Sequence, residues 1–477
     1  MSSFRWPLVL TALLTLVLVQ PPPARALIIA ESADDVCDED DDPCIVDEEV
    51  DVVDGSELDF GTRTVRVEGA GVFDFEDGDG IIACGDFEAE VSGNAIKAKG
   101  SSLFGTEGGS IGLYARRPCS LNAAVPCVDD NDCTTAGAGL CTGTGGTVSL
   151  DGKILGNADS PARILIVAAG DVDILGQITV ASTSADYDGG TITIQSSFGS
   201  IAIADNLELT SGAFGTGGTV LLQAAEDIDV DAVIDANGGD FDGGLVALAA
   251  GGDVTITEDI TANAVSGAGF GGEIDVQADG NITIVGGGAA NRLNLSTDGH
   301  QSSENFAGDG GIQTYDAGGT IDVSQYARFD ANGSPPDGFG EQVSFTAVGG
   351  ITIAGQVISK AKGNLGGGGS VELYSDGDVV VTGTGFFDVT GQASGGGDVR
   401  IEIDGNLTFA GSADASGANG GVAGRFLADV GTDAAVSGAL LTGGASSSFS
   451  HGELEVEACR VVVSGSITNL AELGENL

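Results

Sequence analysis

The sequence predicts an all-β protein: a right-handed parallel β-helix with coils of about 26–28 residues and a loop insertion held by disulfides. Three observations predict this fold. Phrases led by Gly-Gly recur at a nearly constant spacing, apolar and polar residues alternate after each pair, and no helical periodicity competes with that alternation. The phrases are GGTITIQ from Gly189, GGTVLLQ from Gly217, GGLVALA from Gly243, GGEIDVQ from Gly271, GGSVELY from Gly368 and GGDVRIE from Gly396.

The alternation within each phrase predicts which side chains face the core. Successive side chains of a strand point to opposite faces, so Ile192 and Ile194 share one face. Stacking the coils puts Val246 and Leu248 in the same two columns. With strands about 4.8 Å apart, roughly 15 coils would form a rod about 70 Å long. The step from Gly271 to Gly318 is 47 residues, so one turn carries an insertion or the phase slips there.

Polar turn residues recur nine positions after the second glycine of these phrases. Asp and Asn favour tight turns because their side chains bond nearby backbone groups. Two carboxylates stacked about 5 Å apart repel by roughly 0.8 kcal/mol in water. We therefore expect this column to be solvated or diluted by Asn, with bridging by a cation such as Ca²⁺ as the alternative. Its members are Asp227, Asp253, Asn281, Asp378 and Asn406, of which the three aspartates are the candidate metal ligands.

The N-terminal residues predict export. Arg5 precedes the apolar run from Leu8 to Val19, and Ala24-Arg25-Ala26 fits a cleavage site. Residues 1–26 are therefore expected to be a signal peptide, with a membrane anchor as the alternative. No later apolar run is long enough to span a membrane. We expect an acidic leader over 27–51, the β-helix over 52–477, and a secreted or cell-surface location, with the periplasm still open.

The eight cysteines are even in number, which in an exported chain indicates disulfides. Four of them lie in a loop insertion expected over 117–143. Zinc is the alternative, but the spacings lack the paired C-x2-C elements of a zinc module. Cys37 and Cys44 form a further candidate pair. The full set of candidates is Cys37, Cys44, Cys84, Cys119, Cys127, Cys133, Cys141 and Cys459.

Charge and residue content limit the function. Lys and Arg number 17 against 71 Asp and Glu, a net charge of −54 that repels nucleic acid and anionic lipid. The chain has only two histidines, His300 and His451, so few residues could serve as the base of a Ser-His-Asp triad. A lyase could use an arginine base, but spacing does not select among Arg292, Arg328 and Arg400. The protein is thus more simply interpreted as noncatalytic.

A second insertion is expected over 286–317, where the repeat is interrupted. It contains polar residue types that the coils lack, and loops on a rigid scaffold are where binding sites usually lie. The candidate binding residues are Arg292, His300, Glu304 and Tyr315. A surface loop without a ligand is the alternative.

The stretch GGTVLLQAAEDIDVDAVIDANGG at 217–239, with its neighbours, resembles the secreted right-handed β-helix proteins of Gram-negative bacteria, including filamentous-haemagglutinin-like adhesins. The resemblance covers roughly 145–425. It implies a cell-surface or extracellular rod used in adhesion or as a matrix component, with a surface polysaccharide or another surface component as its partner. The NPNG-type signature of two-partner-secretion adhesins is absent.

Two functions follow as expectations. The first is an exported, noncatalytic structural or adhesive β-helix with no cofactor. The second is a polysaccharide lyase or glycoside hydrolase on the same scaffold, because a fold does not decide a function. The unpaired strands of a terminal coil also make end-to-end self-association an expectation. The segment 453–469 gives little sign of a cap.

Overall fold

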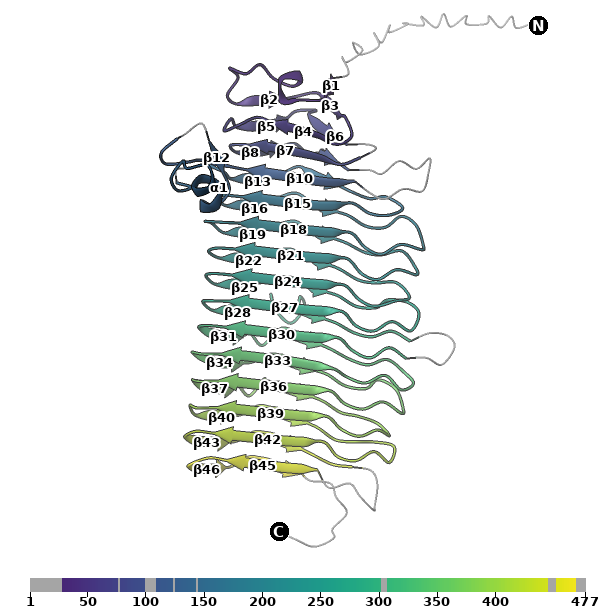
Figure 1. The fold of residues 1–477 in the computed structure, drawn as a ribbon. Helices are drawn as coiled ribbons and strands as arrows, with labels where there is room; N and C mark the ends of the chain where they lie inside the picture. Colours follow the sequence, from purple (N-terminus) through teal and green to yellow (C-terminus); the bar gives the residue numbers. More distant parts are fainter. Residues whose placement is uncertain are drawn as a thin grey trace, which may run out of the picture.

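A computed structural model shows the protein as a parallel β-helix of about 14 turns (Figure 1). It describes residues 28–468 apart from 76–77, 99–108, 123–124, 143–144, 302–306 and 445–451. Three parallel sheets of 16, 15 and 14 strands, here named A, B and C, form the walls. The all-β prediction and the stacking of the repeats are thereby confirmed. The predicted signal peptide at 1–26 lies outside the described residues.

The strands of each sheet follow the chain from the N-terminal to the C-terminal end of the helix. Sheet A contains β1 (Ile28–Ala30), β3 (Glu49–Val52), β6 (Val72–Asp74), β9 (Asn94–Lys97), β14 (Lys153–Leu155), β17 (Ile178–Thr179), β20 (Leu207–Glu208), β23 (Ile234–Asp235), β26 (Ile260–Thr261), β29 (Leu293–Ser296), β32 (Ala327–Asp330), β35 (Gln356–Ile358), β38 (Phe386–Asp388), β41 (Ser412–Asp414), β44 (Ala439–Leu441) and β47 (Ser466–Thr468). Sheet B contains β2 (Cys44–Val46), β5 (Val65–Glu68), β8 (Phe87–Glu90), β13 (Val148–Leu150), β16 (Val172–Ile174), β19 (Ile201–Ile203), β22 (Ile228–Val230), β25 (Val254–Ile256), β28 (Ile282–Ile284), β31 (Thr320–Val323), β34 (Gly350–Ile353), β37 (Asp378–Val381), β40 (Leu407–Phe409), β43 (Asp433–Val436) and β46 (Arg460–Val463). Sheet C contains β4 (Ser56–Asp59), β7 (Gly80–Cys84), β10 (Ser110–Ala115), β15 (Arg163–Ala168), β18 (Thr191–Ser196), β21 (Thr219–Ala224), β24 (Leu245–Ala250), β27 (Glu273–Ala278), β30 (Ile312–Ala317), β33 (Gln342–Ala347), β36 (Ser370–Ser375), β39 (Asp398–Ile403), β42 (Arg425–Val430) and β45 (Glu453–Glu457).

Each coil of the regular repeat has the same plan. A Gly-Gly step leads into a six-residue strand of sheet C, a polar turn leads to sheet B, and a short strand of sheet A follows. A loop then returns the chain to the next Gly-Gly step. In Figure 1 these return loops project from one side of the helix, to the right of sheet C. The return loops therefore form a continuous edge along the rod.

The predicted register is confirmed. Val220 pairs with Val246 across β21 and β24, and Ile192 pairs with Val220 across β18 and β21. All three side chains are fully buried, whereas the intervening Leu221 points outward and is exposed. The inward columns of the three sheets form one continuous apolar core. Because each column repeats in every coil, burial of these columns stabilises the whole stack.

The helix begins earlier than the sequence suggested. The segment 27–51 was expected to be an acidic leader, yet strands β1, β2 and β3 lie within it or overlap it. Ile28 pairs with Val50, and Cys44 pairs with Val65, so these residues already belong to sheets A and B. Alternating apolar residues within the acidic stretch supply the inward columns. The described helix therefore starts at Ile28 rather than at Val52.

The expected cysteine-rich insertion is present, and the structure places it between a strand of sheet C and a strand of sheet B. It contains an antiparallel pair, β11 (Arg117–Pro118) with β12 (Pro126–Cys127), and the helix α1 (Asp130–Thr135). Cys119 is bonded to Cys133, and Cys127 to Cys141. These four cysteines form a small core separate from that of the β-helix. The insertion is thus a disulfide-held unit carried on the rod.

The remaining cysteines differ from one another. Cys37 is bonded to Cys44, as the sequence suggested. Cys84 and Cys459 are free thiols and form no disulfide in the described structure. Cys84 is fully buried in β7, and this burial raises the pKa of its thiol far above the ordinary value. Cys459 is exposed. All eight cysteines were disulfide candidates, but the structure places these two in different parts of the rod.

The interruption over 286–317 is explained by a strand in which the first two residues exchange apolar and polar character. Gly310 and Gly311 form the Gly-Gly step of this coil, and β30 follows them. Here Ile312 points outward and Gln313 points inward, which hides the strand from a search for apolar alternation. β29 also lies within this interval. The expected single insertion is therefore a turn near 286–291 and a long return loop that ends at Gly311.

Within the described residues, no helix is long and apolar enough to cross a membrane.

Candidate functional site

The column of turn aspartates joins successive coils. The Asp227 carboxylate accepts a hydrogen bond from the Asp253 backbone N–H at 2.8 Å, and Asp253 accepts one from Asn281 at 2.6 Å. Asp378 accepts from both the backbone and the side chain of Asn406, and these two hydrogen bonds lower the pKa of Asp378. Since one oxygen of each candidate metal ligand already accepts a hydrogen bond from the next coil, the column is a polar ladder.

One carboxylate cluster of the described residues is compact enough to suggest a cation site. Oxygens of Glu49, Asp51 and Asp74 lie within 4.8 Å of one another on sheet A. The Lys97 ammonium lies among them, 2.7 Å from Glu49 and 2.6 Å from Asp74. An internal cation therefore already binds two of the three carboxylates of this cluster. A grouping of Cys119, Cys127 and Cys133 consists of disulfide-bonded sulfurs.

The structure does not bring the three described binding candidates, Arg292, His300 and Tyr315, together. Tyr315 is fully buried, and its hydroxyl donates to Gln313 in the core at 3.1 Å, so it faces no ligand. Arg292 is exposed beside sheet A, where it donates to Gln356. The His300 ring nitrogen Nδ1 lies 3.1 Å from the Gly267 carbonyl on a return loop. Glu304 lies outside the described residues.

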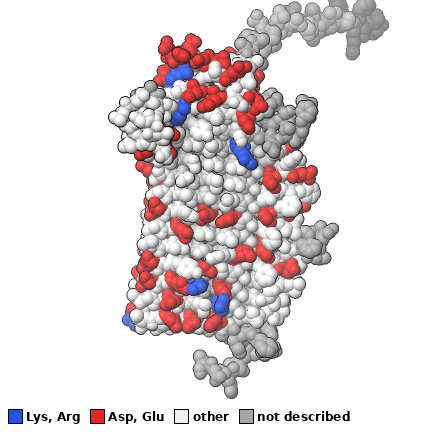
Figure 2. Space-filling view, viewed as in Figure 1, with Lys and Arg blue, Asp and Glu red and all other residues white. Residues whose placement is uncertain are grey.

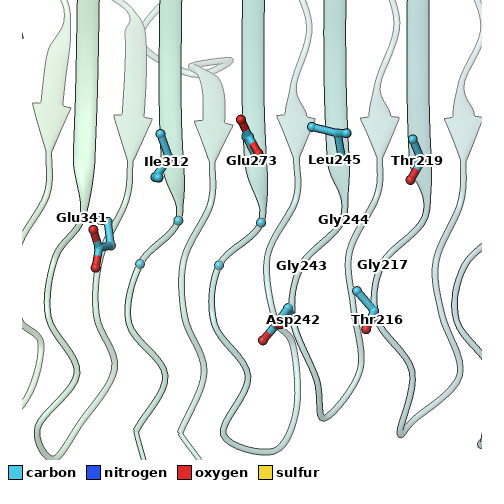
Figure 3. Close-up of a pocket in the computed structure, with 14 residues that line it drawn as sticks. Thr216, Gly217, Thr219, Asp242, Gly243, Gly244, Leu245, Glu273, Ile312 and Glu341 are labelled. Atoms are coloured by element: carbon cyan, nitrogen blue, oxygen red, sulfur yellow. The ribbon is translucent and has the colours of Figure 1, made fainter.

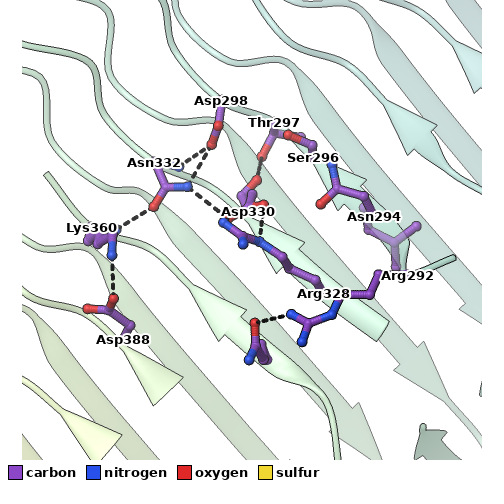
Figure 4. A network of polar contacts seen from close by, with 12 residues as sticks. Arg292, Asn294, Ser296, Thr297, Asp298, Arg328, Asp330, Asn332, Lys360 and Asp388 are labelled. Carbon is purple, nitrogen blue, oxygen red and sulfur yellow. Dashed lines mark hydrogen bonds and ion pairs between the residues drawn. The ribbon is translucent and has the colours of Figure 1, made fainter. Parts of the chain in front are cut away.

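A polar network crosses the outer face of sheet A, where Arg292 lies (Figure 4). Asp330 binds Arg328 through both carboxylate oxygens, at 2.5 and 2.8 Å, and these hydrogen bonds raise the pKa of Arg328. Lys360 contacts Asp388 at 2.6 Å. Asp330 and Asp388 are buried, so the cations compensate carboxylates removed from water. The basic groups of this network are thus largely engaged by internal partners.

A groove of about 520 Å³ runs across four successive Gly-Gly steps at the edge of sheet C. Figure 3 shows Thr219, Leu245, Glu273 and Ile312 side by side at the start of neighbouring strands, above the glycine steps. The glycines form its floor with backbone atoms alone. The glycines that line it are Gly217, Gly243, Gly244, Gly271, Gly272, Gly310 and Gly311.

Glycine is required in this floor because the coils approach closely. A Cβ added to Gly243 would lie 1.9 Å from the Ala262 carbonyl oxygen and 2.5 Å from the Gly272 nitrogen. A Cβ added to Gly271 would likewise lie 1.9 Å from the Thr297 carbonyl oxygen and 2.4 Å from the Gly311 nitrogen. The repeated Gly-Gly pair is therefore first a packing requirement. The groove is its consequence at the surface.

The groove is acidic. Its lining carboxylates are Asp242, Glu273 and Glu341, and the lining contains no Lys, Arg or His. Burial raises the pKa of Glu341, with the nearby charge of Asp309 as the second cause. These carboxylates can accept hydrogen bonds from hydroxyl or amine groups, and they repel anions. The site therefore suits a neutral or cationic ligand.

A row of exposed apolar side chains lies on the return loops, partly next to this groove and partly in coils beyond it. Asp242, which lines the groove, also contacts this row: its carboxylate accepts a hydrogen bond from the backbone N–H of Phe270 at 3.1 Å. Each member lies between a sheet A strand and the following sheet C strand, and their exposed fractions run from 38 to 59%. We call this row the apolar rim; it consists of Tyr187, Phe214, Phe241, Phe270, Phe339, Leu365 and Val422.

Sequence inspection missed the apolar rim although a signal is present. Each member lies two to four residues before the second residue of the Gly-Gly step, or before Glu341 in the case of Phe339 and Gly424 of an Ala-Gly step in the case of Val422. The distance in sequence from the apolar residue to the glycine step varies because the return loops differ in length. Backbone hydrogen bonds nevertheless stack the loops; Gly243, for example, donates to the Phe270 carbonyl at 2.8 Å. Only the stacked loops show that these residues share one edge.

Comparison with known proteins gives no further assignment: no family model matches the chain, and neither the curated proteins nor the solved structures contain a significant match.

Proposed function

We propose that this protein is an exported, noncatalytic rod that adheres to a surface polysaccharide along its glycine-lined edge. The observation that carries the proposal is the apolar rim, whose exposed apolar side chains lie on seven return loops, four of which also lead into the acidic groove. Contiguous exposed apolar surface on a soluble protein commonly marks an interaction site. An elongated edge with repeated features suits a ligand that also repeats.

The chemistry of the edge favours a neutral or amino-sugar polymer. Aromatic rings such as Phe241 and Phe270 offer flat apolar surfaces for the C–H faces of sugar rings. Asp242 and Glu273 can accept hydrogen bonds from hydroxyl groups. Acidic polymers are disfavoured, since Figure 2 shows Asp and Glu spread over the visible face with few Lys or Arg. Coils about 4.8 Å apart present these groups at a spacing close to one sugar unit of an extended chain.

The arginine chemistry weighs against the alternative of a lyase. An arginine base must lose its proton, but carboxylate partners raise the pKa of both Arg328 and Arg400. Arg400 is held by Glu402 and lies 6.0 Å from the ring centroid of Tyr374. The groove carboxylates also lack a cationic partner among their lining residues. We therefore assign them to ligand contact.

Binding to defined soluble polysaccharides tests the proposal. We expect the protein to bind hydroxyethyl cellulose or a chitosan oligomer in calorimetry, and not polygalacturonate. The triple variant F214A/F241A/F270A should bind at least about tenfold more weakly, because each lost ring contact contributes roughly 0.5–1.5 kcal/mol. L175A is the matched control, since Leu175 is equally exposed but lies outside the return loops.

Two outcomes would contradict the proposal. Equal binding by the triple variant and the control would remove the apolar rim from the site. Repeated release of reducing ends or unsaturated products from any of these polymers would instead identify the protein as an enzyme.

A further inference from the structure

The two ends of the rod are finished differently. At the N-terminal end Ala30, Cys44 and Val46 are buried beneath the segment that contains the short 3-10 helix η1 (Ala33–Asp35) and the Cys37–Cys44 disulfide. At the other end no described residue covers the inward columns, and we call it the open end. Val461 and Val463 are 42% and 48% exposed, whereas the residues stacked on them, Ala434 and Val436, are each 1% exposed. One end is therefore capped and the other exposes core side chains.

The open end also exposes the edges of all three sheets. Among the described residues, β45, β46 and β47 are the last strands of sheets C, B and A, and each pairs with the preceding coil on one side only. Ile467, on β47, is 45% exposed, whereas its partner Leu440 is 2% exposed. Unpaired strand edges beside apolar side chains readily pair with another chain. The end offers three such edges around one apolar centre.

An exposed thiol lies in the same coil. Cys459 lies at the corner between β45 and β46 and is a free, exposed cysteine. The other free cysteine of the described residues, Cys84, is buried in the core. An unpaired, exposed cysteine in a disulfide-containing chain is available to pair with a second chain. The thiol and the open end thus point independently to the same surface.

We propose that two copies of this chain join through their open ends, around a two-fold axis that passes through the corner at Cys459. This axis lays β45 antiparallel to β46 of the second copy and β47 antiparallel to its own counterpart. The inward columns of the two copies then form one continuous core. An isologous contact of this kind is the commonest form of homodimer.

The same arrangement is complementary in charge. The C-terminal end of β45 carries Glu457, and β46 begins with Arg460. Around this axis Glu457 of each copy faces Arg460 of the other. The Arg460 side chain is 70% exposed and bridges Asp433 within its own chain at 2.6 Å, which leaves room for a second carboxylate. The ion pairs between Glu457 of one copy and Arg460 of the other would favour this two-fold axis over an axis through a different corner of the coil.

The capped N-terminal end decides what kind of assembly forms. A head-to-tail contact would need the buried columns at Ala30 and Val46 to open, and it would continue into a filament. The cap also carries the acidic stretch 38–42, which would meet Glu453 and Glu455 at the open end with like charge. Tail-to-tail pairing uses up the open ends and stops at two copies.

Light scattering coupled to size exclusion tests this on the exported chain without its first 26 residues. We expect twice the mass of one chain. Oxidised glutathione should join Cys459 to Cys459, with two thiols each losing a proton and the disulfide being reduced to two molecules of glutathione. The covalent dimer should appear on nonreducing gels for wild type and for C84S, and disappear for C459S.

Charge reversal tests the axis. R460E should weaken the dimer at least about fivefold in dilution experiments, and E457R/R460E should restore it, because the two reversals face each other across the interface. A monomer at all concentrations would overturn the proposal, as would a dimer without a Cys459 bridge. A wild-type monomer that dimerises once residues 469–477 are removed would also overturn it. That result would mean that the chain covers its own end.

Discussion

The carboxylate of Asp227 accepts a hydrogen bond from the backbone N–H of Asp253, one full coil further along the chain, at 2.8 Å. This contact is one step of a ladder in which each polar side chain bonds the next coil. A repulsive stack of charges is avoided because each acceptor faces an N–H group rather than a second bare carboxylate. The successive steps are Asp171 to Ser200, Ser200 to Asp227, Asp227 to Asp253, Asp253 to Asn281 and Asn281 to Thr320.

Asp253 tests whether the acceptor or the charge matters. D253A leaves the Asn281 N–H and side-chain amide without their shared acceptor, so we expect a loss of about 1 kcal/mol in the free energy of unfolding. D253N keeps an acceptor oxygen and should lose much less. Denaturant unfolding gives the total effect, and hydrogen exchange at Asn281 locates it. Equal losses for the two variants would show that the charge itself carries the contribution.

Acidification should act in opposite directions at two aspartates. Burial raises the pKa of Asp235, against hydrogen bonds from Asn237 and Thr261 that lower it. A carboxyl whose pKa is raised in the folded state opposes folding above that pKa, so its penalty disappears as the pH falls through it. We therefore expect D235N to be more stable than wild type at pH 7, by up to about 1 kcal/mol, and the difference to shrink on acidification.

Asp378 is the matched control of opposite sign. Hydrogen bonds from Asn406 lower its pKa, so its contribution is present above the ordinary pKa of about 3.9 and is lost as the pH falls through the lowered value. D378N should be less stable than wild type at pH 7, by a few tenths of a kcal/mol because the group is exposed to solvent. Unfolding curves between pH 7 and pH 3 check both variants. If the stability differences of D235N and D378N from wild type changed with pH in the same direction, the opposite pKa shifts of Asp235 and Asp378 would be contradicted.

Periodic features of the fold were predictable from the sequence. Val220 and Val246 pair as the Gly-Gly phrases required, because a period of two fixes the inward face once the coils are aligned. The turn residues Asp227 and Asp253 were also placed correctly in one column. The hydrogen-bond donors to these carboxylates could not be predicted. The alternation of residues gives the direction of each side chain but not the position of the N–H groups in the next coil.

Features that break the period were predicted less well. Gln313 occupies an inward position that other coils fill with an apolar residue, so its strand was taken for a loop and Tyr315 for a surface residue. The apolar rim was missed for a related reason. Phe241 and Phe270 lie at different distances from their Gly-Gly steps, and only loop stacking aligns them. Irregular loops carry the candidate site, and periodicity cannot locate irregular positions.

Gln313 and Tyr315 should be strongly coupled. The Gln313 amide donates to the Leu295 and Asp330 carbonyls at 3.0 and 2.9 Å, and its oxygen accepts from Tyr315. Q313M keeps the volume but removes these buried hydrogen bonds and leaves the Tyr315 hydroxyl without its acceptor, which should cost about 2–4 kcal/mol of unfolding free energy. Q313M/Y315F removes the orphaned hydroxyl and should recover about 1 kcal/mol relative to the sum of the two single variants. Additive single-variant losses in denaturant unfolding would exclude the coupling.

The close approach of coils at Gly243 gives the sharpest test of the stacked architecture. In G243A the new methyl carbon would overlap the Ala262 carbonyl and the Gly272 nitrogen, both of which are backbone atoms fixed by neighbouring strands. We expect a loss of about 3 kcal/mol or more, because neither atom can move without separating two coils. Gly383 is the matched control: nothing lies within 4 Å of an added Cβ, and its φ is not left-handed. G383A should be neutral or stabilising by up to about 1 kcal/mol, since alanine restricts the unfolded chain. Thermal and denaturant unfolding of the two variants decide the matter, and tolerance of alanine at Gly243 would mean that the coils are not packed at this distance.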